Sequence, residues 1–433
     1  MQQRPRRTAV ALGALGSLAL LASRFEPRAL AAEGGAQPPV AAGEVPASIT
    51  PGAPASPITY EQVIARARQG APDLKVARAL EAVARTSVGI AGVLPNPTVF
   101  GGTSTLGPRV SATLSVPLII LGQRGAAIDA SRAEVATVRV EGEIAWLDVR
   151  AGAARAFVSL WLAERTAWAR AEAAALVQRL EASVRTRVEV GAAPQVEELR
   201  VHAERLRADA DAAETAARIV IAGSDLGRWL GLADGSGLRA SGDPLVPASP
   251  PPLHAMAERL PGGAPVRREE ADARAADARA SRERALVRPA LTLDVGLDAY
   301  DPTTPGTSYR AQLGVEVPVF NQRGAYIERE VTSANVARAR AEVSLSRATA
   351  DLLSSYRSFE AISARRLALE TGVVPAADAA AAATEESYAL GHAALVAVLD
   401  ANRARIDARM SLLEASAARA LAWIDVERAV GQP

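Results

Sequence analysis

This chain of 433 residues has few of the side chains that usually carry enzyme chemistry, and their spacing matches no catalytic or metal-binding motif. Cysteine is absent, which excludes disulfides, thiolate metal sites and thiol catalysis. The three histidines, His202, His254 and His392, lie far apart in the sequence, so a histidine-based metal centre is not expected. The sequence has neither a phosphate-binding glycine loop nor a nucleophile elbow. We therefore predict a protein that is not an enzyme, with no catalytic residues, no metal site and no cofactor.

The remaining candidates for chemistry are charged residues in two kinds of surroundings. One group of charged residues alternates with apolar residues in short segments; it consists of Asp294, Asp298, Arg310 and Glu316. The second group, Glu197 and Asp400, follows glycines that interrupt long helical segments. The net charge is only +1, from 49 Lys+Arg against 48 Asp+Glu, which argues against a general nucleic-acid binder. The role of these charges therefore depends on the elements that position them.

The amino terminus has the pattern of an export signal. A positively charged start precedes an apolar run at 9–22, which is too short for a transmembrane helix, and a small-residue cleavage site follows at 29–31. We predict a signal peptide at 1–31 and, because the next segment is rich in Pro, Gly, Ala and Ser, a disordered linker at 32–57. The mature protein is expected to be exported and not to be held in a membrane by a helix.

The mature chain repeats once. A Val-Pro pair followed by Gln-Arg-Gly-Ala occurs at Pro117 and again at Pro318, and a glycine break occurs at Gly191 and again at Gly391. Both pairs are separated by about 200 residues, and such a constant offset is typical of a tandem duplication. The two predicted repeats are residues 58–240 and 253–431.

Each repeat is predicted to contain the same elements in the same order. A short helix and a medium helix precede a β-hairpin, and a very long helix then leads to the glycine break and a return helix. The predicted ranges are 98–117 and 290–318 for the hairpins, 124–190 and 323–390 for the long helices, and 194–232 and 394–431 for the return helices. The medium and return helices of one repeat together match the length of its long helix, so we expect them to lie end to end beside it.

The hairpin segments alternate apolar and polar residues, as in the run 309–317, which predicts a sheet with one apolar and one polar face. Their length is close to the 9–11 residues with which a tilted strand crosses a bilayer. A half-buried soluble sheet has the same pattern, and the strands alone do not separate the two interpretations. Export favours the membrane, and so does the lack of any predicted helix placed to cover the apolar face.

A membrane location for these strands has a consequence for assembly. Four strands cannot close a barrel, and unpaired strand edges are not tolerated in lipid. Several chains must then share one barrel. The polar face, with Asp294, Asp298, Arg310 and Glu316, would line its lumen because these charges cannot face lipid without a large cost.

This duplicated order of elements resembles the outer membrane efflux protein family, the TolC-like channels, over nearly the whole mature chain. The resemblance is carried by Leu-Pro-Asn-Pro at 94–97, the strand-ending Pro117 and Pro318, the Gln-Arg-Gly repeats, and the segment 388–401. The Pro-Asn-Pro start and the Arg-Gly-Ala after each hairpin are most similar to the CzcC-like heavy-metal efflux branch.

The resemblance implies a mainly α-helical protein with a small β part, built from two tandem repeats. It implies a homotrimer in the outer membrane of a Gram-negative bacterium, in which each chain gives four strands to a 12-strand β-barrel above a periplasmic tunnel of long coiled-coil-like helices. Such a channel docks on a periplasmic adaptor protein and a proton-driven inner-membrane pump, and it is a passive conduit for efflux. Heavy-metal cations are the expected cargo. A multidrug or type I protein-secretion duct remains an alternative, as does an exported coiled-coil structural protein outside the membrane.

The resemblance also assigns roles to the glycine breaks. Gly191, Ala192, Gly391 and His392 are expected at the periplasmic tip, where they would contact the adaptor; glycine permits the left-handed backbone that a helix stop requires. Pro117 and Pro318 are expected where strand becomes helix, because proline lacks the N–H that continues a ladder.

Two acidic residues are expected at the closing aperture of the tunnel, Asp400 and Glu197. Family members often have two acidic residues three apart after the second glycine, but here the first position is Ala397, so Asp400 alone would form an acidic ring. An ordinary exposed helix residue is the alternative for Asp400. Arg185 and Arg187 are the candidate partners of Glu197.

Overall fold

The computed structural model describes residues 56–105, 109–300 and 306–432. The predicted signal peptide lies outside the described residues, as does nearly all of the predicted linker. The last linker residues, Ser56 and Pro57, belong to strand β1 (Ser56–Thr59), which pairs in parallel with β4 (Leu238–Ser241). The two strands are about 180 residues apart in the chain. The structure therefore differs from the prediction there, since local composition gives no sign of so distant a partner.

The segment predicted as the first repeat has the predicted helices, with ends that shift by one or two residues. Helix α2 begins with a capping box. The Thr59 hydroxyl accepts a hydrogen bond from the Gln62 amide, and the Gln62 side chain accepts one from the Thr59 amide. Pro72 stands in the first turn of α3, where its missing N–H costs nothing. The helices of this repeat are α2 (Tyr60–Gly70), α3 (Pro72–Ala91), α4 (Gln123–Glu189) and α5 (Gln195–Leu230).

The second repeat differs from the prediction in its long helix. The segment predicted as one helix at 323–390 is interrupted by a π-helical turn at Leu369–Val373, whereas α4 is continuous over 67 residues. Pro375 follows directly, and because proline cannot donate to the carbonyl one turn earlier, the hydrogen-bond ladder is broken there. The helices are α6 (Leu253–Ala257), a 3₁₀ turn (Leu260–Gly262), α7 (Ala264–Ala285), α8 (Gly324–Ala368), α9 (Val374–Ala389) and α10 (Leu395–Val430).

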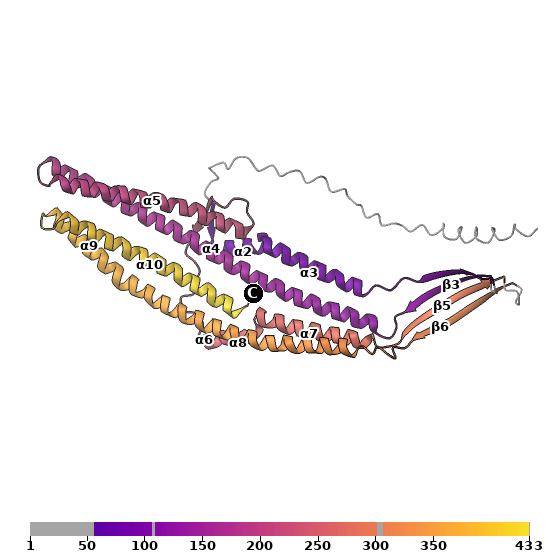
Figure 1. The fold of residues 1–433 in the computed structure, drawn as a ribbon. Coiled ribbons are helices and arrows are strands. Elements are labelled where there is room, and N and C mark those ends of the chain that lie inside the picture. The colour runs from indigo at the N-terminus through magenta and orange to yellow at the C-terminus, as the bar shows by residue number, and fades with distance from the viewer. Residues whose placement is uncertain (1–55, 106–108, 301–305, 433) are drawn as a thin grey trace, which may run out of the picture. The chain divides into compact units, whose positions relative to one another are not determined.

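The two hairpins join into a single antiparallel sheet (Figure 1). Its strands are β2 (Thr98–Thr103), β3 (Val110–Leu118), β5 (Ala290–Ala299) and β6 (Thr307–Glu316). The order is β2-β3-β5-β6, so the repeats meet at the β3–β5 ladder, whose register runs from Val110 opposite Ala299 to Leu118 opposite Leu291. Among the described residues, β2 and β6 each have one neighbouring strand, so each has one edge without a strand partner.

The helices next to the sheet pack side by side in the same order as the strands to which they connect. Next to the sheet, α3 packs on α4, α4 on α7, and α7 on α8, and farther along α5 packs on α4 and α10 on α8. The end of the return helix α10 meets the start of the medium helix α7, as predicted, whereas the end of α5 meets the last residue of the short helix α2, just before α3 begins. Gly231, at φ +70°, lies so close to Gly70 that a side chain at either glycine would collide with backbone. In the second repeat the Ala264 amide donates to the Gly431 carbonyl at 2.9 Å.

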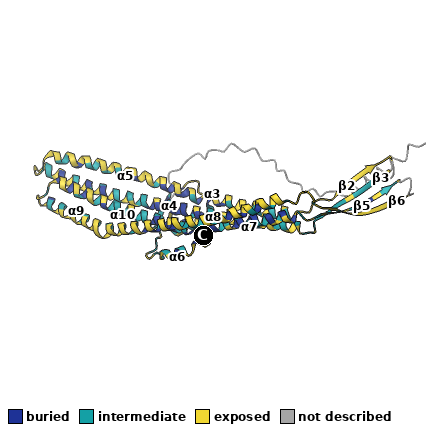
Figure 2. Cartoon of the chain, turned by 60° about the horizontal axis from the view of Figure 1, so that its bottom comes forward, coloured by how far each residue is buried: buried dark blue, intermediate teal, exposed yellow. Residues whose placement is uncertain are grey.

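Small residues form much of the core where the repeats meet. On α4, Ala151, Ala154 and Val158 pack against α10, where Ala417 and Ala420 face them. Alanine keeps the helix axes close and fits the helical backbone without loss of side-chain entropy. Buried residues follow the helix interfaces, whereas most of β6 is exposed (Figure 2). Among the described residues, no helix combines the length and the apolar character needed to cross a membrane.

Candidate functional site

The polar face of the sheet brings the predicted lumen residues together. The Arg310 guanidinium donates to Asp298 at 3.2 Å and to the Thr113 hydroxyl at 3.5 Å, so it reaches across from β6 through β5 to β3. Gln312 donates to Asp294 at 3.3 Å. Glu316 lies on the same face by alternation, at the end of β6 opposite Ala290. The polar face therefore contains one charged cross-strand pair, Arg310–Asp298, and one hydrogen-bonded pair, Gln312–Asp294, while Glu316 lies at its end.

The other face of the sheet is apolar and exposed. Tyr309 is 85% exposed and Leu313 is 61% exposed, and on β5 Val295 is 47% exposed. A contiguous apolar surface of this kind marks a contact with lipid or with another chain. Phe100 on β2 lies on the polar face, because its register places it opposite Thr113. The short, glycine-containing β2 has weak alternation, so its sequence gave little indication of its facing.

The two prolines stand close to the ends of strands. Pro117 pairs with Thr292 one residue before β3 ends, beyond the point where β2 stops at the level of Ser115. Proline is tolerated at such a position because only one neighbouring strand remains there. Pro318 lies just past β6, which ends at Glu316.

Both long helices start after a residue with left-handed backbone. Gly122 precedes α4 with φ +89°, and Arg323 precedes α8 with φ +55°. A non-glycine residue in this region is strained unless its surroundings hold it. The Arg323 amide donates to the Asn321 side chain at 3.1 Å, and its guanidinium donates to Glu283 of α7 at 2.7 Å. These contacts fix the turn from β6 into α8.

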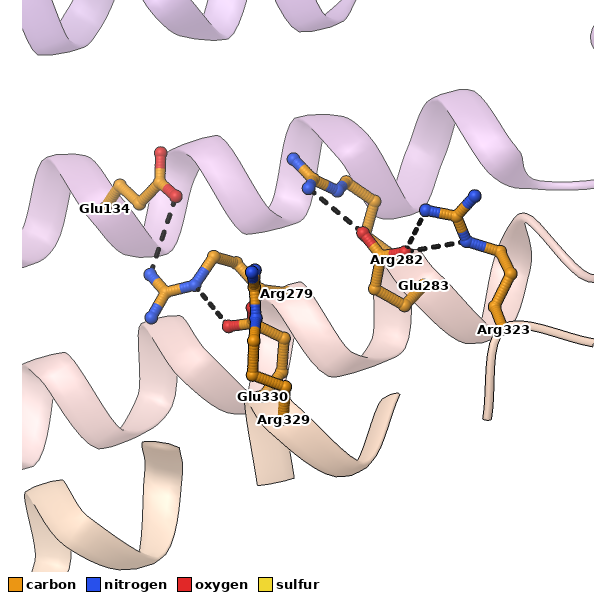
Figure 3. Close-up of polar contacts among 7 residues, drawn as sticks. All are labelled: Glu134, Arg279, Arg282, Glu283, Arg323, Arg329 and Glu330. Atoms are coloured by element: carbon orange, nitrogen blue, oxygen red, sulfur yellow. Dashed lines mark hydrogen bonds and ion pairs between the residues drawn. The ribbon is translucent and has the colours of Figure 1, made fainter. Parts of the chain in front are cut away.

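Glu283 belongs to a group of ion pairs at the junction of strands and helices (Figure 3). Its carboxylate is buried and accepts from Arg323 and, at 3.1 Å, from Arg282. Burial raises the pKa of Glu283, but the hydrogen bonds from Arg323 and Arg282 outweigh it, so the net pKa is lowered. The carboxylate is therefore ionised and couples α7 to the first residue before α8.

A second buried carboxylate, Glu330 of α8, joins three helices in the same region (Figure 3). Arg279 of α7 donates to Glu330 at 2.8 Å and lies 3.6 Å from Glu134 of α4. Arg329 donates to the other oxygen of Glu330 at 3.0 Å. The hydrogen bond from Arg279 lowers the pKa of Glu330. Sequence reasoning missed both carboxylates, because in a chain with 48 acidic and 49 basic residues no local pattern distinguishes a buried pair.

The four predicted tip residues form two equivalent turns. Gly191 and Gly391 have φ +76° and +79°. The Ala192 amide donates to the carbonyl of residue 187 at 2.7 Å, and the His392 amide donates to that of residue 387 at 2.9 Å, the pattern of a glycine-terminated helix. All four sit between consecutive helices. The described residues contain no group of three or more His, Asp or Glu arranged to hold a metal ion.

Glu197 contacts a tyrosine of the other repeat. The Tyr388 hydroxyl donates to Glu197 at 3.3 Å, while the Arg187 guanidinium stacks 4.6 Å from the Tyr388 ring centroid and donates to its carbonyl at 3.2 Å. Of the two arginines considered for Glu197, Arg187 joins it through the tyrosine, and Arg185 pairs with Glu189. Burial, followed by the charge of Glu197, raises the pKa of Tyr388. The sequence gave no indication of this tyrosine because its partner is 191 residues away.

Asp400 lies in a separate cluster. It is well exposed and pairs with Arg403 at 3.4 Å, and Arg403 also donates to Glu204 of α5 at 3.1 Å. The hydrogen bond from Arg403 lowers the pKa of Glu204. The structure therefore does not bring Asp400 and Glu197 into contact with each other: each belongs to its own link between the repeats.

Known proteins share both sequence and fold with this chain. Residues 265–432 match the family described as outer membrane efflux protein. The cobalt-zinc-cadmium resistance protein CzcC of Cupriavidus metallidurans is 24% identical over 388 residues, which covers 87% of this chain and 91% of that protein.

Solved structures extend the likeness to the whole described fold. A membrane protein from Pseudomonas aeruginosa superposes with a TM-score of 0.70 at 17% identity, over 86% of this chain and 90% of that one. CusC gives a TM-score of 0.70 at 16% identity over 89% and 96%, and the outer membrane protein VceC from Vibrio cholerae gives 0.67 at 17% over 86% and 96%. The fold is thus that of outer membrane channel proteins. The resemblance to the outer membrane efflux protein family, inferred from the sequence, is confirmed.

Proposed function

We propose that this chain is one subunit of a homotrimeric outer membrane efflux channel, a passive conduit from the periplasm to the exterior. The observation that carries the proposal is the four-stranded sheet, which has one polar face, one exposed apolar face and two edges that are unpaired within the described part of the chain. In lipid each free edge needs a partner, so β6 of one copy would pair with β2 of the next. Three chains of four strands would close a barrel of twelve, with the Arg310–Asp298 pair inside.

The edge helices support the same assembly. Helix α3 packs on α4 with one side and exposes apolar residues on another, at Val76, Leu80, Val83 and Ile90, which are spaced as one helical face. Helix α8 is the other outer member of the row next to the sheet. Pairing β6 with the next β2 would bring α8 to the next α3, so a single rotation would cover both the sheet edges and the apolar helix face.

The partners and the cargo complete the proposal. The turns at Gly191 and Gly391 would meet a periplasmic adaptor, which connects the channel to a proton-driven inner-membrane pump. Asp400 and Glu197 would lie at the closing aperture of the tunnel. Heavy-metal cations are the proposed cargo, on the strength of the similarity to a protein named for cobalt, zinc and cadmium resistance. A drug or protein duct predicts instead that deletion leaves metal tolerance unchanged. An exported coiled-coil protein outside the membrane would leave the apolar sheet face unexplained.

Engineered cysteines test the edge pairing directly, because the chain has no cysteine of its own. We expect Val99→Cys on β2, combined in turn with Ala311→Cys, Leu313→Cys and Val315→Cys on β6, to give dimers and trimers on oxidation in outer membranes. The control pair is Leu293→Cys with Leu313→Cys, which face each other within one sheet and should give only intrachain bridges. Absence of any interchain product across the whole panel would contradict a shared barrel.

A further inference from the structure

A cavity of about 770 Å³ opens between α4, α8, α10 and the segment after β4. Its walls carry two tryptophans, Trp161 and Trp168, and an apolar floor that includes Leu412 and Leu413. Positive charge dominates the rest of the lining, whose acidic members among the described residues are Glu172 and Asp243. The lining arginines are Arg165, Arg179, Arg366, Arg405, Arg409 and Arg419.

Carboxylates pair with four of these arginines. The ion pairs are Arg165–Asp243 at 3.6 Å, Arg366–Glu370 at 3.0 Å, Arg405–Glu385 at 3.6 Å and Arg409–Asp378 at 3.0 Å. Within the described parts of the chain, Arg179 and Arg419 have no carboxylate at ion-pair distance. Positive charge is therefore left uncompensated on the cavity wall.

Arg419 is held in place by neutral groups. Its Nε donates to the Ser363 hydroxyl at 3.1 Å, a second nitrogen donates to the Pro247 carbonyl at 3.2 Å, and the guanidinium lies 5.4 Å from the Phe359 ring centroid. Burial, followed by the charge of Arg366, lowers the pKa of Arg419. Arginine nevertheless stays protonated in proteins, so a partly buried charge without a counterion favours binding of an anion.

Two of the lining arginines, one on α8 and one on α10, make reciprocal hydrogen bonds to serines of the other helix. Arg366 of α8 donates to Ser416 of α10 at 3.2 Å, and Arg419 of α10 donates to Ser363 of α8 at 3.1 Å. In each helix the serine and the arginine are three residues apart, so the exchange fixes both guanidinium groups on the same side of the helix pair. Each guanidinium already uses its Nε and one terminal nitrogen, Arg366 for Ser416 and Glu370 and Arg419 for Ser363 and the Pro247 carbonyl. Among the described contacts, the second terminal nitrogen of each arginine remains to donate to a carboxylate or phosphate group.

We propose that this cavity binds an amphiphilic anion, whose carboxylate or phosphate group is held by Arg366 and Arg419 and whose apolar body lies on Trp161, Leu412 and Leu413. The site is separate from the polar sheet face and from the tip turns, and binding there does not depend on transport. The same anionic group is present on free phosphate and on a lipid, and the two sources differ in whether they need the apolar floor.

The test uses the full chain in the state in which it is purified, placed in phosphatidylcholine nanodiscs. Tryptophan fluorescence reports the site because Trp161 and Trp168 line it, and calorimetry gives the affinity. The probes are dodecyl phosphate, dodecanoate and inorganic phosphate, with dodecyl maltoside as the uncharged control. We expect saturable binding of the anionic amphiphiles that is at least about tenfold tighter than that of the maltoside.

Variants decide whether the arginines carry the binding. Arg419→Gln should weaken the affinity for dodecyl phosphate about tenfold or more, and so should Arg366→Gln. The test therefore still holds if one of the two variants folds poorly. The matched control is Arg357→Gln on α8, an exposed arginine that pairs with Glu360 outside the cavity and should leave the affinity unchanged. Inorganic phosphate binding as tightly as dodecyl phosphate would support an anion site filled by free phosphate. No saturable binding to the wild-type protein, equal affinity of both arginine variants and wild type, or equal affinity for the maltoside would overturn the proposal.

Discussion

Arginine placed on the exposed apolar face of β6 should block membrane assembly, whereas arginine on the neighbouring residue should not. Leu313 lies in the central part of β6, opposite Leu293, and its side chain is exposed on the apolar face. Gln312, the adjacent residue, points to the polar face and donates to Asp294 at 3.3 Å. The substitutions Leu313→Arg and Gln312→Arg therefore place the same side chain on opposite faces of one strand.

The expected difference follows from the cost of charge in lipid. An arginine that faces lipid near the bilayer midplane costs about 2–4 kcal/mol, which lowers the equilibrium for insertion by roughly 30-fold to 1,000-fold for each copy. In a trimer the cost recurs three times. At position 312 the new guanidinium would face the Asp294 carboxylate in an aqueous lumen, so we expect little loss there.

The assay measures the fraction of each variant that remains in outer membranes after urea extraction, together with unfolding in denaturant from phosphatidylcholine vesicles. We expect the wild-type protein and Gln312→Arg to resist extraction alike, and Leu313→Arg to be lost from the membrane fraction. Equal behaviour of the two variants, in either direction, would refute the assignment of the faces.

Other substitutions separate the roles of single residues. Gly391→Ala should cost about 1 kcal/mol of stability at the tip and reduce efflux, because alanine is strained at φ +79°, whereas Gly142→Ala inside α4 should be neutral or stabilising; equal melting shifts would count against a required left-handed turn. Gly70→Val should lower the melting temperature by several degrees, because its side chain would collide with the Leu230 carbonyl; an unchanged melting curve would argue against the end-to-end helix contact. Glu330→Gln should cost about 2 kcal/mol at neutral pH. The folded-state pKa of this carboxyl is lowered, so its stabilisation is complete above the unfolded value of about 4.5 and is lost as the pH falls through the folded pKa; the variant should lose less stability over that range, and parallel pH profiles would contradict the pairing.

The helices and the hairpins could be predicted because their signals are local or periodic. Long alanine-rich segments favour helices, and the glycine breaks indicate where those helices end. Alternation in β5 and β6 indicates which residues share a face. The interruption of the second long helix was missed, although Pro375 was visible, because a proline can bend a long helix without ending it. The β1–β4 pairing was missed because parallel partners lie far apart in sequence.

The candidate site was predictable only in part, for a related reason. The glycine turns and the charges on the polar face of the sheet belong to segments with a recognisable pattern, so their positions followed from the elements. The partners of Glu197 and Glu330 come from other helices and from the other repeat, and arginine and glutamate are too common in this chain for spacing to select them. Pairings of this kind depend on which helix faces pack together, and only the three-dimensional structure gives that.

The mass of the protein extracted from outer membranes in mild detergent, corrected for bound detergent, tests the central proposal most directly. Each chain has a mass of 44.9 kDa before any signal peptide is removed. A shared barrel predicts a complex of about three chains in the outer membrane fraction. A soluble monomer that never enters that fraction would contradict it.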